Sequence, residues 1–198
     1  MRPDLDALAA GDPAFAAAYA RCGPPPERGA EASFAGLARI VIGQQVSVYA
    51  AAAIADRFTA ADFHQPAVAA AAPPDALRAV GLSAAKTKTI AALARATVAG
   101  DFDFAALNAA GDEEASATIM AQPGLGRWSA DLYLLFALRR PDVWPIGDLA
   151  IRKAIGRLYA ASETPNEKTV DAWGEAFRPR RSAAARFLWH FFKHPGAI

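Results

Sequence analysis

Two groups of residues in the stretch 121–148 have types and a spacing that could do chemistry. The first is a glycine hairpin, Gln122-Pro123-Gly124-Leu125-Gly126, between two apolar patterns of helical period. Its glycines allow positive φ angles and leave no side chain between the backbone and a ligand. The N–H groups that open the second helix lack intrahelical partners, so they can bind a phosphate with help from the helix dipole. A lone hairpin of this kind can also simply connect two packed helices.

The second group centres on Asp148, which follows Gly126 by twenty-two residues and precedes a helical pattern with apolar residues at Ile151, Ile155 and Leu158. An aspartate at this point is expected to cap the helix, which stabilises it by roughly 1 kcal/mol. The positive end of the helix dipole also favours the ionised carboxylate. Asp148 can therefore act as a cap and present a fixed negative charge at the same time.

The elements that must position these residues are helices. The chain has 198 residues, of which 54% are hydrophobic, so it can bury a sizeable core. Its alanine-rich segments are punctuated by proline and glycine, and no run alternates with period two for long enough to form a strand. We predict an all-α protein, with helix N-caps at Ser33, Ser47, Ser83, Asp103 and Asp112.

The hairpin and Asp148 together resemble the signature of the helix-hairpin-helix DNA glycosylase superfamily, in which L-P-G-x-G precedes a catalytic aspartate by about twenty residues. Within it, the chain is most similar to the 3-methyladenine DNA glycosylase II branch, which releases alkylated bases. Three further stretches carry the resemblance: IGQQVS at 42–47, GLSAAK at 81–86, and 177–189, which opens with FRPRRS. The resemblance covers about residues 33–192, and Gln122 stands where a hydrophobic residue is common.

The resemblance implies a two-lobed helix-hairpin-helix glycosylase fold with the active site in the interlobe cleft. One lobe would combine residues 1–32 with 141–198. The other would comprise residues 33–140 and carry the helix-hairpin-helix at about 118–138.

The resemblance also assigns roles to two side chains. Asp148 would be the catalytic residue, whose charge stabilises the oxocarbenium-like sugar as the glycosidic bond breaks. Gln45 would enter the gap left by the extruded nucleotide. Relatives that also cut the strand have a lysine two residues after the second hairpin glycine, where this chain has Trp128. We therefore expect a monofunctional enzyme that leaves an abasic site.

Aromatic residues are the candidates for a base pocket. Trp128 and Trp189 match aromatic positions of the branch, and Tyr133 and Trp144 are further candidates. Bases alkylated at ring nitrogens are cationic, and an indole face attracts a cation by about 0.5–2 kcal/mol. Each of these side chains could equally belong to the core, because large aromatics are usually buried.

The resemblance places the DNA backbone on Gly124, Leu125, Gly126, Ser129 and Lys86. It also implies an optional sodium or potassium ion on the backbone carbonyls of Met120, Gln122 and Gly124. No cofactor is required, and the single cysteine, Cys22, excludes a four-cysteine iron–sulfur cluster.

The formal net charge of +1 is low for a protein that binds nucleic acid. Local basic clusters offset this, among them Lys86 with Lys88 and the group Arg178, Arg180 and Arg181. No apolar run is long enough for a membrane span, and the N-terminus has no signal-peptide pattern. We expect a soluble, cytoplasmic, nucleoid-associated monomer.

The predicted function is a monofunctional DNA glycosylase that flips and hydrolytically excises 3-methyladenine and 7-methylguanine type bases from double-stranded DNA in base excision repair. One alternative is a non-catalytic helix-hairpin-helix DNA-binding module, which needs the hairpin but has no use for Asp148 or an aromatic pocket. Another is a helical interaction domain in which the hairpin is only a turn.

Overall fold

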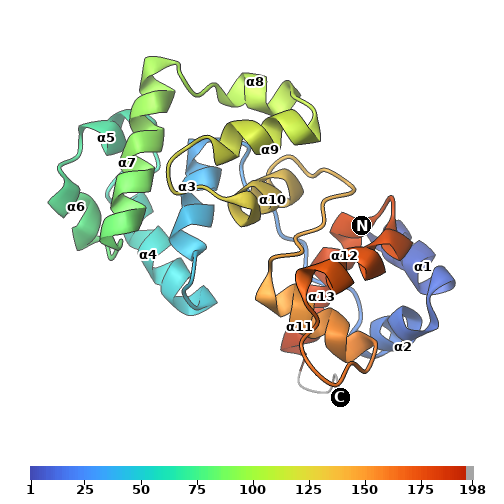
Figure 1. Cartoon of the computed structure of the whole chain (residues 1–198). Helices are drawn as coiled ribbons and strands as arrows, with labels where there is room; N and C mark the ends of the chain where they lie inside the picture. The colour runs from blue at the N-terminus through green and yellow to red at the C-terminus, as the bar shows by residue number, and fades with distance from the viewer. Residues whose placement is uncertain (195–198) are drawn as a thin grey trace. The chain divides into compact units, whose positions relative to one another are not determined.

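A computed structural model of the chain describes residues 1–194, and every regular element in that range is a helix, as predicted (Figure 1). No helix of these residues is both long and apolar enough to cross a membrane. In chain order the elements are α1 (Arg2–Gly11), α2 (Pro13–Cys22), α3 (Phe34–Gly43), α4 (Val48–Ala60), α5 (Pro66–Ala71), α6 (Pro74–Ala79), α7 (Ala84–Ala99), α8 (Phe104–Ala109), α9 (Asp112–Met120), α10 (Arg127–Phe136), α11 (Leu149–Leu158), α12 (Glu167–Gly174), the 3₁₀ turn η1 (Glu175–Phe177) and α13 (Arg181–Lys193).

Short polar side chains begin several of these helices. Ser33, Ser47, Ser83 and Asp103 each accept a hydrogen bond from a first-turn N–H, which confirms four predicted caps. The predicted cap at Asp112 is wrong by one residue, because Gly111 takes the N-cap position of α9. Asp112 is instead the first residue of the helix, where its negative charge interacts favourably with the helix dipole.

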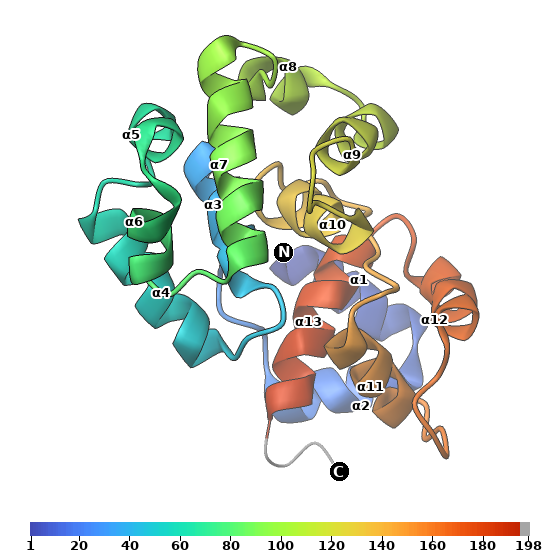
Figure 2. The same ribbon diagram turned by 60° about the vertical axis from the view of Figure 1, so that its left-hand side comes forward.

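The chain divides into two compact units: Met1–Arg28 with the chain from Arg140 onward (unit 1), and Gly29–Arg139 (unit 2). In unit 2, α3 packs against α4, α7 and α10, while α5 and α6 pack against α7 (Figure 2). α9 packs against α10, so the helix-hairpin-helix lies wholly within this unit. Its core contains the fully buried Leu37, Ile90, Leu93 and Leu135.

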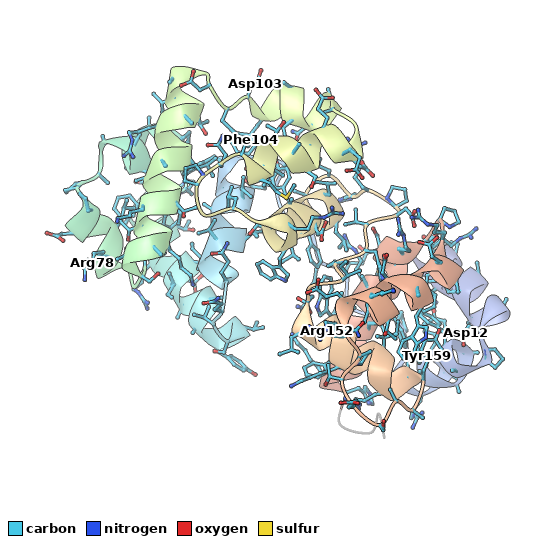
Figure 3. The ribbon with its side chains drawn as sticks, viewed as in Figure 1. Asp12, Arg78, Asp103, Phe104, Arg152 and Tyr159 are labelled. Carbon is cyan, nitrogen blue, oxygen red and sulfur yellow. The ribbon has the colours of Figure 1, made fainter. Side chains whose placement is uncertain are left out.

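In unit 1, α11 packs against α13, and α1 and α2 join them. The ring of Phe15 contacts Phe187 and Phe177, with centroids 4.6 and 5.8 Å away. The Tyr159 hydroxyl at the end of α11 donates to the Asp12 carboxylate at 2.5 Å, and both side chains are visible in Figure 3. Burial, together with this bond to Asp12, raises the pKa of Tyr159. The packing and this bond fix α11, and with it Asp148 at its N-terminus.

Candidate active site

The hairpin between α9 and α10 owes its shape to Gly124. Gly124 has a φ of +81°, and a Cβ there would overlap the Thr89 hydroxyl of α7. Gly126 has a φ of −106°, so the expected positive φ is absent there. A Cβ at Gly126 would meet nothing within 4 Å. Gly124 thus lets the hairpin approach α7, whereas Gly126 leaves the backbone uncovered.

The start of α10 has the features of an anion site. Gly126 is its N-cap, and no side chain caps the helix there. Uncapped first-turn amides at the positive end of a helix are suited to a phosphate. Arg127 opens the helix with its side chain 61% exposed, and its Nε donates to Asp131 Oδ1 at 2.7 Å.

Three residues that we expected at the DNA backbone have side chains engaged inside unit 2. Leu125 is buried in the core, and the buried Ser129 accepts a hydrogen bond from Gln44 at 3.0 Å. Lys86 Nζ donates to the Ile42 carbonyl at 2.9 Å, and burial lowers the pKa of this amine. These side chains hold the hairpin and its neighbours in place, so a phosphate contact would fall to backbone groups.

Two of the three carbonyls predicted to hold an ion already accept hydrogen bonds. The Gln122 carbonyl accepts from Leu125 N at 3.1 Å, and the Gly124 carbonyl accepts from Gln44 Nε2 at 3.4 Å. A carbonyl oxygen has a second lone pair, so an ion at these oxygens remains a proposal. Among residues 1–194, no group of three His, Cys, Asp or Glu side chains could hold a metal.

Gln45 is exposed in the turn between α3 and α4, with a φ of +53°. This left-handed conformation costs a non-glycine residue about 1–2 kcal/mol. Strain of this kind often marks a functional position. The exposed apolar side chains Val46, Val48 and Tyr49 flank Gln45, and Tyr49 is 89% exposed. This apolar surface was not predicted, although its residue types are visible in the sequence.

Asp148 and Trp189 meet in unit 1. Asp148 is the N-cap of α11, and its Oδ1 accepts from Ile151 N at 3.0 Å. The same oxygen accepts from Trp189 Nε1 of α13, also at 3.0 Å. Both side chains are half-buried. The carboxylate is therefore oriented by the end of one helix and by an indole N–H from another.

The four aromatic candidates for a base pocket separate into two pairs. Trp144 is 5% exposed, donates to the Val170 carbonyl at 3.0 Å and packs so tightly against Gly174 that a Cβ there would overlap its indole. Tyr133 is completely buried, and its hydroxyl donates to Asn108 at 3.3 Å. The structure places these two in the cores of their units, whereas Trp128 and Trp189 are half-buried.

The predicted basic cluster at 178–181 is largely neutralised within unit 1. Arg178 and Arg181 both pair with Asp142, at 2.7 and 2.9 Å, and Arg178 also pairs with Glu175 at 2.9 Å. Arg180 lies 3.6 Å from Asp4. These side chains form internal ion pairs, so the cluster does not offer the basic surface for DNA that was predicted.

Asp131 is a buried carboxyl that was not predicted from the sequence. It lies on α10, is 3% exposed and pairs with Arg127. Burial raises its pKa from 3.8 to about 6, against the lowering effect of Arg127 and with a small contribution from Glu113. An aspartate four residues after an arginine indicates a helical ion pair, but no local pattern shows that this one is buried.

The chain is similar in sequence to a known protein family. The sequence profile of the HhH-GPD superfamily base excision DNA repair proteins matches residues 38–179, which include the hairpin and Asp148. The chain belongs to this superfamily. It is 32% identical over 158 residues to DNA-3-methyladenine glycosylase 1 of Schizosaccharomyces pombe, a match that covers 77% of this chain and 69% of that protein. It is 29% identical over 165 residues to DNA-3-methyladenine glycosylase 2 of Escherichia coli, covering 77% of this chain and 55% of that protein.

Solved structures of the superfamily have the same fold. The Schizosaccharomyces pombe 3-methyladenine DNA glycosylase, in complex with abasic DNA, superposes with a TM-score of 0.91 at 28% identity, covering 98% of both chains. The 3-methyladenine DNA glycosylase of Archaeoglobus fulgidus has a TM-score of 0.82 at 24% identity, covering 96% of this chain and 69% of that chain. At this identity the similarity supports the fold alone. This member of the HhH-GPD superfamily is thus a DNA-3-methyladenine glycosylase-like enzyme with the predicted all-α glycosylase fold.

Proposed function

We propose that this protein is a monofunctional DNA glycosylase that extrudes alkylated bases of the 3-methyladenine and 7-methylguanine type from double-stranded DNA and hydrolyses their glycosidic bond. The observation that carries the proposal is the Asp148 carboxylate, which caps α11 and is oriented by the indole N–H of Trp189. Membership of a base excision repair family and the similarity to 3-methyladenine glycosylases support it.

The chemistry follows from the charge of the substrate. A base alkylated at a ring nitrogen is cationic and leaves readily with the electron pair of the C–N bond, so no strong general acid is required. The sugar then develops positive charge, which the Asp148 carboxylate would stabilise. Water forms the new bond to the sugar carbon and releases a proton to the solvent, and the product is an abasic site. The indole N–H of Trp189 holds Asp148 Oδ1 in place, so little reorganisation is needed during the reaction.

The DNA contacts of the proposal come from unit 2. Backbone amides at the uncapped start of α10 would bind a phosphate, and Gly126 leaves them uncovered. Exposed Gln45 would fill the gap left by the extruded nucleotide. Apolar residues inserted at a duplex step are a common means of opening the stack, which fits Val46, Val48 and Tyr49 around Gln45.

The deciding experiment is base release from methylated DNA, with the released bases identified by chromatography. Wild type should release cationic methylated bases faster than normal ones. Asp148→Asn keeps the shape and most of the cap but loses the charge, so its rate should fall by about 10²–10³ or more while DNA binding persists. Asp171→Asn, on exposed surface of the same unit, is the matched control and should behave as wild type. DNA binding without base release by wild type would favour the non-catalytic module.

The product distinguishes hydrolysis from strand cleavage. Trp128 occupies the position at which lyase relatives have their lysine, so no amine at this position can attack the sugar. Borohydride should therefore trap no covalent adduct between the protein and DNA. A trapped adduct that disappears when a lysine is replaced would overturn the monofunctional assignment while leaving base excision intact.

A further inference from the structure

A four-residue turn, 44–47, joins α3 to α4 and carries Gln45. Gln45, Val46 and Ser47 are exposed, and Gln45 has the left-handed φ described above. A glutamine keeps this conformation only where the surrounding structure holds it. The contacts that hold the turn therefore decide how Gln45 is presented to a duplex.

The preceding residue, Gln44, ties this turn to the hairpin. Its Nε2 donates to the Ser129 hydroxyl at 3.0 Å and to the Gly124 carbonyl at 3.4 Å. These partners lie 85 and 80 residues away in the sequence. Ser129 is 2% exposed in the first turn of α10, and Gly124 is packed against Thr89. One amide group thus connects the Gln45 turn to both parts of the element that would bind phosphate.

A second contact holds the end of α3, just before the turn. Lys86 Nζ, from α7, donates to the carbonyl of Ile42 at 2.9 Å. Ile42 lies in the last turn of α3, where a positive charge interacts favourably with the helix dipole. Helix α7 also supplies Thr89 against Gly124. α7 therefore supports both the turn and the hairpin, and Gln44 closes the connection between them.

We propose that Gln44 is a positioning residue that fixes Gln45 relative to the hairpin, so that a duplex held by its phosphate meets Gln45 at the extruded nucleotide. This inference rests on the proposed function and extends it to a residue that acts through Gln45. Only a duplex leaves a gap to fill, because a single strand has no widowed base. Loss of Gln44 should therefore impair the processing of duplex DNA selectively.

The test compares Gln44→Met with wild type under single-turnover conditions. Methionine keeps the size of the side chain and removes both N–H donors. We expect a loss of about tenfold or more in excision from methylated duplex, with single-strand excision and affinity for undamaged duplex within about twofold. Gln65→Met, an exposed glutamine in the same unit, is the matched control and should leave all three values unchanged. Equal losses on duplex and single strand would overturn the proposal.

A double variant tests whether Gln44 acts through Gln45. If it does, Gln44→Met/Gln45→Ala should excise from duplex no more slowly than Gln45→Ala alone. Multiplied losses in the double variant would contradict the proposal. Ser129→Ala removes the acceptor from the other side and should show the same preference for single strands, which keeps the test available if Gln44→Met does not fold.

A binding readout separates this inference from the proposed chemistry. A duplex with a tetrahydrofuran abasic analogue opposite 2-aminopurine reports insertion through fluorescence and requires no excision. Wild type should change this fluorescence, and Gln44→Met should bind the duplex with at least about a tenfold smaller change. A normal change with Gln44→Met overturns the positioning role alone. A wild type that changes fluorescence without excising any base contradicts the proposed function but not the role of Gln44, and one that does neither overturns both.

Discussion

Replacing Asp131 by asparagine should make the protein more stable at neutral pH. Asp131 is 3% exposed, and burial raises its pKa from 3.8 to about 6 in spite of Arg127 at 2.7 Å. The carboxyl of Asp131 therefore binds its proton more tightly in the folded state than in the unfolded state. At 1.36 kcal/mol per pKa unit, a rise from 3.8 to about 6 corresponds to about 3 kcal/mol of unfolding free energy.

Because the pKa of Asp131 is raised in the folded state, its effect on stability falls in a defined pH window. The favourable contribution of protonated Asp131 is complete below pH 3.8 and is lost as the pH rises through about 6. Asparagine is neutral throughout, so the unfolding free energy of Asp131→Asn minus that of wild type should increase with pH. About 2 kcal/mol of this increase should develop between pH 4.5 and pH 7.5.

The assay is urea unfolding followed by circular dichroism at several pH values across this window. Asp142→Asn is the control of opposite sign. Burial alone would raise the pKa of Asp142, but hydrogen bonds from Arg181 and the charges of Arg181 and Arg178 lower it. Its contribution is present above the ordinary pKa and is lost as the pH falls, so Asp142→Asn should be least stable relative to wild type near neutrality. A difference for Asp131→Asn that does not vary with pH would refute the reasoning.

Three further predictions follow from the site. Trp189→Phe keeps a ring but loses the N–H that holds Asp148 Oδ1, so single-turnover excision should fall about tenfold at unchanged DNA affinity, and a wild-type rate would show that this bond does not orient the carboxylate. Gly124→Ala should lower the unfolding free energy by at least about 1 kcal/mol because of its φ and its overlap with Thr89. Gly126→Ala meets no neighbour, so it should destabilise less, through the N-cap position alone, and should weaken DNA binding in fluorescence anisotropy; the reverse order would contradict both assignments. Trp144→Phe should destabilise by about 1–3 kcal/mol through loss of its bond to the Val170 carbonyl, without changing the ratio of cationic to neutral bases released, and a changed ratio would return Trp144 to the pocket.

The sequence by itself determined the helices, most of their caps and the signature of the family. Helical period and a capping side chain are local properties, so the caps at Ser33, Ser47, Ser83 and Asp103 follow from the few residues around each of them. The placement of Asp148 at the start of α11 is local in the same way. Of the five predicted caps only Asp112 was wrong, by a single residue, where glycine and aspartate compete for the N-cap position. The caps at Asp12 and Asn166 were not predicted, although both residue types are favoured there.

Only the tertiary structure decided which candidate side chains lie at the site and which are buried in a core. The sequence could not distinguish Trp189, which donates to Asp148, from Trp144 and Tyr133, which lie in the cores of their units. The residues around a buried aromatic side chain and those around one in a site follow the same helical pattern. The bonds of Gln44 to Gly124 and Ser129 join residues 80 and 85 positions apart, and the pKa of Asp131 depends on the burial of α10. Burial and long-range hydrogen bonds arise from the packing of distant helices, and a periodic pattern along one helix contains no information on which partner will cover it.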